Sequence, residues 1–324
     1  MYNISKIAYV TDLHLGSAPT RLPSFTGKLA ALRDMGITRI INGGDMFDLR
    51  GDMWKPRGLV DSRVPSDQML EMSDYSRRIT SDLMRTVTEH ICKNGLYFSI
   101  FGNADYLSAP EMNRFKESQP LKAFHRFQVP LAQPYNGLVS WALREEGRSN
   151  LFISGLSGIP ALSCDAGARN VNANNPWYMG VVSSERYNEL VSKLGIPGRE
   201  NIVVTHMPAK GVMDSFYHKG MDRYFEDQGS EVLRNSVTEL GPILHLTGHV
   251  HGAPTVVGDY RPFVVNYGKT VTINPGGGDL HDEDICGIKG VKIAVIDPYT
   301  LINMRNDGVL TEDNIKDAKA VEII

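Results

Sequence analysis

The sequence has few cysteines and no long apolar segment, and each absence excludes a class of protein. Its 324 residues include three cysteines, Cys92, Cys164 and Cys286, which are far apart and form no CxxC pair. They provide no disulfide framework, and their small number is typical of a reducing compartment. No apolar run reaches the roughly 18 residues that a membrane helix needs, and the first residues do not resemble a signal peptide. The sequence therefore predicts a cytoplasmic protein with no membrane partner.

The chain also lacks an excess of positive charge. It has 34 basic and 37 acidic residues, a formal charge of -3, which disfavours nucleic-acid binding through bulk charge. Apolar residues make up 42% and charged residues 22% of the chain, so disorder, collagen and coiled coil are excluded. The length fits either two domains of about 150 residues or one large α/β domain.

Short apolar runs recur along the chain, and several end in polar residues of the kind that do chemistry. These runs are residues 7–10, 37–41, 96–101, 202–204 and 243–246. Each is rich in branched or aromatic residues, which is typical of buried strands in an α/β sheet. Periodic apolar positions between them predict helices near 24–35, 67–93, 184–194 and 230–240, and further strands are expected at 270–273 and 291–296.

The polar residues at the ends of these runs form one set of potential metal ligands. Asp12 and His14 are two positions apart, so an extended chain points both side chains the same way, and the other members are Asp45, Asn103, His206, His249 and His251. In α/β sheets such strand ends converge on one crevice. Two carboxylates, four imidazoles and one amide exceed the needs of a tetrahedral zinc site. They suit two metal ions about 3.5–4 Å apart that share a carboxylate.

The order of these motifs resembles the calcineurin-like metallophosphoesterase family. The matching segments are Asp12-Leu13-His14, Gly44-Asp45-Met46-Phe47-Asp48, Gly102-Asn103-Ala104-Asp105, His206 and Gly248-His249-Val250-His251. The resemblance covers about residues 5–280. It implies a four-layer α/β/β/α sandwich of two mixed sheets flanked by helices. We therefore expect a single domain over residues 1–324, with loop insertions near 49–66, 106–135 and 155–183.

The resemblance also implies a role for each ligand. Asp12, His14 and His251 would hold one metal, Asn103, His206 and His249 would hold the other, and Asp45 would bridge them. Asp48 would support the ligands, and the catalytic set would comprise Asp45, Asn103, Asp105 and His206. The two divalent ions could be Mn, Fe, Zn, Co or Ni. They would supply a bridging hydroxide for in-line attack on phosphorus, as in a phosphodiesterase acting on a small phosphoester or nucleotide-like substrate.

The sequence departs from the family at Ala104, where many members have a histidine that assists the leaving group. Without positioned acid catalysis, which contributes roughly 10²–10⁴-fold, we expect a preference for leaving groups that are stable anions. Asp105 could replace the acid, as could His218, which we expect in a loop, or His281. An exposed surface position is the simpler explanation of either histidine.

The loop after Asp48 has two interpretations. Arg50 and Arg57 could clamp a phosphate while Trp54 stacks on a base, or the loop could simply be solvated. Together with His218, these three residues are the candidate substrate-binding groups.

Four other functions remain open at this point. A nucleotide-linked pyrophosphatase or a phosphomonoesterase would use the same ligands. A nuclease would need a DNA-binding cap, for which the sequence gives no sign, and a catalytically silent scaffold would not need all seven ligands. The sequence leaves the oligomeric state open, because the tail after Ile302 could pack on its own sheet or on a neighbour.

Overall fold

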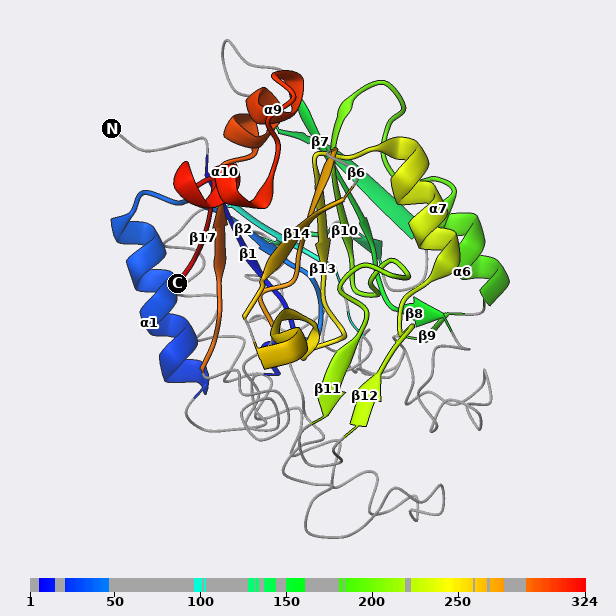
Figure 1. Cartoon of the computed structure of the whole chain (residues 1–324), viewed down its shortest axis with the longest axis horizontal. Coiled ribbons are helices and arrows are strands. Elements are labelled where there is room, and N and C mark those ends of the chain that lie inside the picture. Colours follow the sequence, from blue (N-terminus) through cyan, green and yellow to red (C-terminus); the bar gives the residue numbers. More distant parts are fainter. Residues whose placement is uncertain are drawn as a thin grey trace, which may run out of the picture.

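The computed structural model of the chain contains two β-sheets that pack against each other between helices (Figure 1). The residues that it describes are 6–14, 21–46, 96–100, 102, 128–130, 132–133, 137–143, 150–160, 181–182, 184–218, 223–258, 260–266, 269–276 and 290–324. All structural statements below concern these residues. Figure 1 shows α1 on one flank of the sheets and α6 and α7 on the opposite flank.

The first sheet has a parallel centre and an antiparallel edge. Its order is β17 (Val321–Ile323), β16 (Ala294–Ile296), β1 (Ile7–Val10), β2 (Arg39–Asn42), β3 (Leu96–Ser99) and β4 (Gln128–Pro130). Strands β1 to β4 are parallel neighbours, whereas β16 runs antiparallel to both β1 and β17. The C-terminal segment therefore adds an edge strand to its own sheet.

The second sheet is also mixed. Its order is β14 (Phe263–Asn266), β15 (Thr270–Ile273), β13 (Leu244–Thr247), β10 (Glu200–Thr205), β7 (Leu151–Leu156), β6 (Gly137–Leu143) and β5 (Ala132–Gln133). The four central strands β15, β13, β10 and β7 are parallel, and the flanking strands are antiparallel. Two short pairs lie outside the sheets: β8 (Ile159–Pro160) with β9 (Val181–Val182), and β11 (Phe216–His218) with β12 (Arg223–Phe225).

Side-chain alternation along the strands creates three apolar layers. In β1, Ile7 and Tyr9 belong to the core between the sheets, whereas Ala8 and Val10 belong to the layer beneath α1. In β10 the same alternation places Val203 on the outer face of its sheet. Successive strand residues point to opposite faces, so a strand that is apolar throughout is buried on both sides. This explains why the central strands of both sheets appear in the sequence as continuous apolar runs.

Helices cover both outer faces. Helix α1 (Arg21–Asp34) packs Phe25, Leu29 and Leu32 onto the first sheet. Helices α6 (Ser184–Val191) and α7 (Glu231–Leu240) cover the second sheet, and α7 begins at the N-cap Ser230 and ends at Gly241. Helices α9 (Pro298–Asn306) and α10 (Glu312–Asp317) precede the last strand, and the 3-10 helix η3 spans Ala253–Gly258. The chain is thus an α/β protein with two mixed sheets flanked by helices, as predicted.

The elements agree with most of the sequence predictions. The expected strands and the helices near 24–35, 184–194 and 230–240 are present, but the strand expected at 291–296 is formed only by Ala294–Ile296. The predicted helix 67–93 and insertion 49–66 lie outside the described residues, as does most of the insertion near 106–135. The single domain and its insertions stay predictions. None of the helices in the described ranges is long and apolar enough to cross a membrane.

Candidate metal centre

The candidate site lies beyond the carboxyl ends of strands from both sheets. Asp12 and His14 follow β1, and Asp45 follows β2. These two segments are held together by backbone hydrogen bonds, because the Asp12 N–H donates to the Gly44 carbonyl and the His14 N–H donates to the Asp45 carbonyl, both at 2.9 Å. In the second sheet His206 follows β10, and His249 and His251 follow β13. Parallel strands thus deliver these side chains to a common edge.

The backbone at the site has an unusual conformation. The angle φ is 52° at Asp12, 44° at His14, 50° at Asp45 and 66° at His249. Non-glycine residues rarely adopt such left-handed values, which cost on the order of 1–3 kcal/mol each and concentrate at functional sites. The tight turns therefore aim the side chains at one another at the expense of stability.

The donor atoms of five of these residues lie close together. His14 Nε2 is 3.1 Å from His251 Nε2, which is 3.3 Å from Asp12 Oδ1. Asp45 Oδ2 is 3.8 Å from His14 Nε2 and 3.3 Å from His206 Nε2. A single carboxylate oxygen thus contacts histidines that come from different sheets.

These donors form two sets that meet at Asp45. In the first set, Asp12, His14, Asp45 and His251 each offer one atom, and the four atoms lie within 4.8 Å of one another. The second set contains His206 and His249, whose rings are 5.3 Å apart. Asp45 joins them because its Oδ2 also contacts His206.

The spacing and chemistry of the donors fit divalent cations. Neighbouring ligands at about 2.1 Å from a shared ion are about 3.0–3.4 Å apart in octahedral or tetrahedral geometry, close to the contacts between His14, His251 and Asp12. Carboxylate and imidazole donors together suit zinc and the other first-row divalent metals. The residues present therefore fit a metal centre.

Hydrogen bonds fix the orientation of the Asp12 carboxylate, which is fully buried. The His249 N–H donates to both Asp12 oxygens at 3.0 and 3.1 Å, and the Thr11 hydroxyl donates to Oδ2 at 2.9 Å. Burial raises the pKa of Asp12, but the charge and hydrogen bond of His251 outweigh it and hold the pKa below its usual value. The Asp12 carboxylate is therefore ionised and held in one orientation, as a metal ligand would need to be.

The ring of His206 is also held in one orientation. Its Nδ1–H donates to the Gly43 carbonyl oxygen at 3.0 Å, so Nε2 faces Asp45. Metal-ligating histidines commonly donate their other ring N–H in this way. Burial alone would lower the pKa of His206, but the neighbouring carboxylates, chiefly Asp45, raise it to about 9. In contrast, burial and the nearby His206 lower the pKa of His249 to about 4.

Glycines allow the carboxylates to approach the backbone. A Cβ atom at Gly102 would lie 2.0 Å from Asp45 Oδ1, and one at Gly248 would lie 2.6 Å from Asp12 Oδ2. Neither position has room for a side chain. These glycines carry a signal in the sequence, since each of them directly precedes a predicted ligand.

The structure places six of the seven predicted metal ligands near one another, and the seventh is Asn103, which follows Gly102 in the sequence. Asn103 itself lies outside the described residues, as do Asp48, Ala104, Asp105, Arg50, Trp54, Arg57 and His281. His218 was expected in a loop, but its backbone forms the end of strand β11, because residues 216–218 pair with 223–225.

Two supporting residues were missed in the sequence. The Thr11 hydroxyl binds Asp12, and the Gly43 carbonyl binds His206. Thr11 could have been considered from its position beside the DxH motif, but the contact of Gly43 with His206 joins residues 163 positions apart and has no local signal.

The fold is shared with solved structures. One crystal structure superposes with a TM-score of 0.55 at 13% identity, covering 91% of this chain and 96% of its own. The crystal structure of a dimetal phosphatase from Danio rerio superposes with a TM-score of 0.50 at 10% identity, covering 90% of this chain and 92% of its own. At these identities the similarity establishes the fold. No protein-family model and no curated protein sequence matches the chain.

Proposed function

We propose that this protein is a metal-dependent phosphohydrolase and that phosphodiesters are its main substrates. One observation carries the proposal: the Asp45 carboxylate contacts histidines of both ligand sets, in a fold shared with a dimetal phosphatase. A carboxylate in this position is what a pair of cations about 3.5–4 Å apart requires.

The donor contacts support an assignment of each ligand. Asp12, His14 and His251 would hold one ion, because their donor atoms cluster with that of Asp45. His206 and His249 would hold the second ion together with Asn103, and Asp45 would serve both. When bound, two divalent cations lower the pKa of water and neutralise the charge of the phosphoryl oxygens.

The chain's own residues keep this machinery in place. Thr11 and the His249 backbone fix Asp12, and the Gly43 carbonyl fixes the ring of His206. The ligands therefore need little reorganisation when substrate binds, which favours catalysis. Water attacks phosphorus in line with the departing oxygen, so no covalent enzyme intermediate is needed.

A phosphomonoesterase is the second candidate, because the solved Danio rerio relative in fold is named as a phosphatase. A nucleotide-linked pyrophosphatase uses the same chemistry on an anhydride. Ala104 affects the leaving-group preference of all three candidate enzymes, since a site without a histidine there favours leaving groups that are stable anions. We therefore propose that aryl esters and anhydrides are better substrates than alkyl esters. Arg50, Trp54, Arg57 and His218 remain the proposed substrate-binding residues, and Asp105 a proposed acid or supporting group.

The test compares protein stripped with a chelator with protein reloaded with Mn²⁺ or Zn²⁺. Its substrates are a bis-aryl phosphodiester, an alkyl phosphodiester, an aryl monoester, a cyclic nucleotide and a nucleotide pyrophosphate. We expect activity only after reloading, with the bis-aryl diester hydrolysed fastest. Fastest hydrolysis of the monoester would replace the diesterase assignment with a phosphatase, and metal uptake without any hydrolysis would leave a scaffold.

A matched pair of variants locates the activity. Asp45→Asn removes the shared negative charge, so we expect bound metal to fall and hydrolysis to drop by about 10²–10³-fold or more. The control is Asp297→Asn, at the N-cap of α9, where asparagine caps as well as aspartate. Equal activity of the two variants would contradict the proposed centre.

A further inference from the structure

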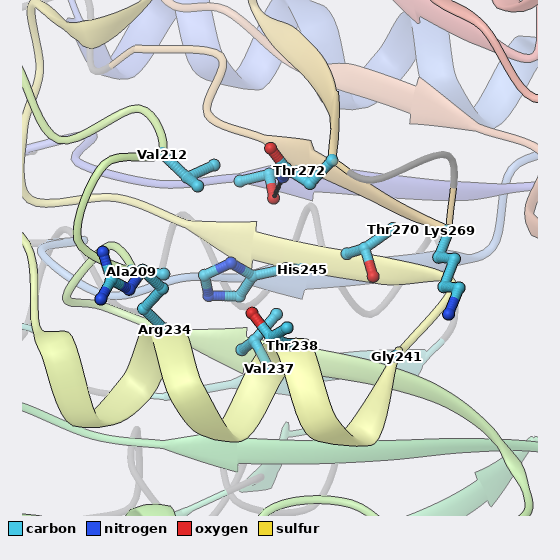
Figure 2. Close-up of a pocket in the computed structure, with 11 residues that line it drawn as sticks. Ala209, Val212, Arg234, Val237, Thr238, Gly241, His245, Lys269, Thr270 and Thr272 are labelled. Atoms are coloured by element: carbon cyan, nitrogen blue, oxygen red, sulfur yellow. Dashed lines mark hydrogen bonds between the residues drawn. The ribbon is translucent and has the colours of Figure 1, made fainter.

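A buried asparagine follows the strand that neighbours the proposed histidine ligands in the second sheet. Strands β13 and β15 run parallel, and His245 of β13 pairs with Thr272 of β15. Figure 2 shows both residues among those that line the pocket beneath α7. Beyond this pair, β13 leads into residues 248–251, which we call the histidine turn, and β15 leads into Asn274. Asn274 therefore lies at the same edge of the sheet as the proposed ligands.

The histidine turn has a tight and strained backbone. The Val250 N–H donates to the Gly248 carbonyl oxygen at 2.7 Å, and the angle φ of His249 between them is 66°. A hydrogen bond between residues two apart, around a residue with positive φ, belongs to the rare and strained form of the γ-turn. Such a conformation persists only where the surrounding structure holds it in place.

Asn274 holds the histidine turn from the neighbouring strand end. It is fully buried, and its Nδ2–H donates to the Val250 carbonyl oxygen at 3.0 Å. Its Oδ1 accepts a hydrogen bond from the Gly276 N–H at 2.9 Å, and its backbone N–H donates to the Pro262 carbonyl oxygen at 2.9 Å. A carbonyl can only accept from the amide nitrogen, and an N–H can only donate to the amide oxygen. The two partners therefore fix one orientation of the Asn274 side chain.

The carbonyl that Asn274 holds belongs to the peptide group that leads into His251. Because a peptide group is planar, fixing the Val250 carbonyl also fixes the direction in which the chain enters His251. The backbone of His249 has a hold of its own, since its N–H donates to the Asp12 carboxylate. The side chain of His251 is 22% exposed, whereas that of Asp12 is fully buried, so packing confines His251 less. The hold on the backbone therefore matters most for His251.

We infer that Asn274 is a positioning residue for the proposed metal centre, because it holds His251 in the first ligand set through the Val250 carbonyl. His251 Nε2 lies 3.1 Å from His14 Nε2 and 3.3 Å from Asp12 Oδ1, so a small displacement of the turn removes it from that set. Loss of groups that orient metal ligands typically lowers metal affinity about 10–100-fold. The inference rests on the proposed function, since it requires an ion at the first ligand set.

Asn201 provides a matched control at the other end of the second sheet. It is also buried, and its side-chain amide bonds to the backbone of Ile196 and Arg199 at 2.7–2.9 Å. Asn201 lies near the amino end of β10, whereas the proposed ligands follow the carboxyl ends of the strands. A change at Asn201 therefore removes comparable hydrogen bonds without reaching the histidine turn.

The experiment titrates chelator-stripped wild type, Asn274→Asp and Asn201→Asp with Co²⁺ at pH 7.5. Asn274→Asp keeps the shape of the side chain and the acceptor for Gly276, but it replaces the donor to Val250 with an oxygen. We expect one of the two ions to bind about 10–100-fold more weakly in Asn274→Asp, and both ions to bind to Asn201→Asp as to the wild type. The visible absorption of the Co²⁺-saturated protein, which depends on coordination geometry, should change in Asn274→Asp alone.

Asn274→Ser separates the lost hydrogen bond from the added charge. Serine is uncharged and one bond too short to reach the Val250 carbonyl, so the same ion should be weakened to a similar extent. Unchanged Co²⁺ affinity in both Asn274 variants, or equal losses in the Asn274 and Asn201 variants, would overturn the inference and leave the proposed function standing. Failure of the wild type to bind Co²⁺ would overturn the proposed function and this inference with it.

Discussion

At the residue scale, the site depends on atoms that are absent as much as on ligands that are present. Gly102 has no side chain, and a Cβ atom there would lie 2.0 Å from Asp45 Oδ1 and 2.5 Å from the Asp45 backbone nitrogen. Real Cβ atoms are not found at such distances, so either the carboxylate or the backbone must move. Since Asp45 is the shared ligand of the proposed centre, a small displacement there affects both ions.

We therefore predict that Gly102→Ala reduces hydrolysis by about 10²-fold, since misplacement of catalytic groups by about 1 Å has effects of this size. The measurement is kcat on the bis-aryl phosphodiester together with bound metal. The control is Gly27→Ala, because Gly27 lies inside α1 with nothing within 4 Å of an added Cβ. That change should leave activity unaltered and stabilise the protein by up to about 1 kcal/mol. A Gly102→Ala variant with full activity would contradict the role of the close approach.

At the element scale, the cap of α7 is a separable contribution to stability. The Ser230 hydroxyl accepts a hydrogen bond from the Leu233 N–H at 3.3 Å, and α7 covers the second sheet with Leu233 and Val237. We predict that Ser230→Ala lowers the free energy of unfolding by about 1 kcal/mol, measured in urea. Ser230→Asp should retain the cap and keep most of the stability. If both variants lose the same amount, the hydroxyl does not act as a cap.

Elements that bury a continuous apolar run were predictable from the sequence. Strand β1 is buried on both faces, so Ile7–Val10 is apolar at every position and stands out. The N-cap Ser230 and the apolar face of α7 likewise identify that helix. The predicted ligands of the candidate metal centre could be identified for the same reason, because they follow such strands closely in the sequence.

The elements that sequence reasoning missed lack such a local signal. Strand β6 and the C-terminal β17 gain their place from partners far along the chain, since β17 pairs with β16 and β6 with β7. Helix α9 has no amphipathic pattern that separates it from a loop. Its local sequence signal is the N-cap Asp297 followed by a proline at the first helical position. The burial of His245 against Thr205 could not be predicted either, because the two residues meet only through the pairing of β10 with β13.

At the scale of the whole molecule, the buried His245 predicts a dependence of stability on pH. Its pKa is about 4 in the folded protein and about 6.5 when unfolded. The unfolded chain therefore binds a proton first as the pH falls. The stabilising effect is complete above pH 6.5 and is lost as the pH falls from 6.5 to 4, by about 3 kcal/mol in total.

The comparison with His245→Gln isolates this contribution from the other titrating groups. The free energy of unfolding is measured in urea between pH 7 and pH 4 for both proteins. We expect the difference between wild type and variant to shrink as the pH falls, because glutamine does not titrate. A difference that is constant over this range would show that His245 does not stay neutral in the fold.

Metal binding should release a proton from the molecule, and the reason lies in how the two sheets meet. In the metal-free protein, Asp45 of the first sheet raises the pKa of His206 of the second sheet to about 9. At pH 7.5 the ring is therefore protonated, and Nε2 must lose its proton before it can bind a cation. His249, whose pKa is about 4, has no proton to release at this pH. We predict that His206 releases about one proton for each pair of ions bound, in addition to any proton lost by metal-bound water.

Calorimetric titration of the chelator-stripped protein with Zn²⁺ or Mn²⁺, in two buffers with different ionisation enthalpies, measures this release directly. The apparent affinity should rise with pH up to about pH 9 and then level off, because above that pH His206 is already deprotonated. His206→Gln should reduce the proton release by about one, while Asp297→Asn keeps it unchanged. A binding heat that is the same in both buffers would mean that His206 is not the protonated ligand, and the pairing of the two sheets through Asp45 would lose its chemical consequence.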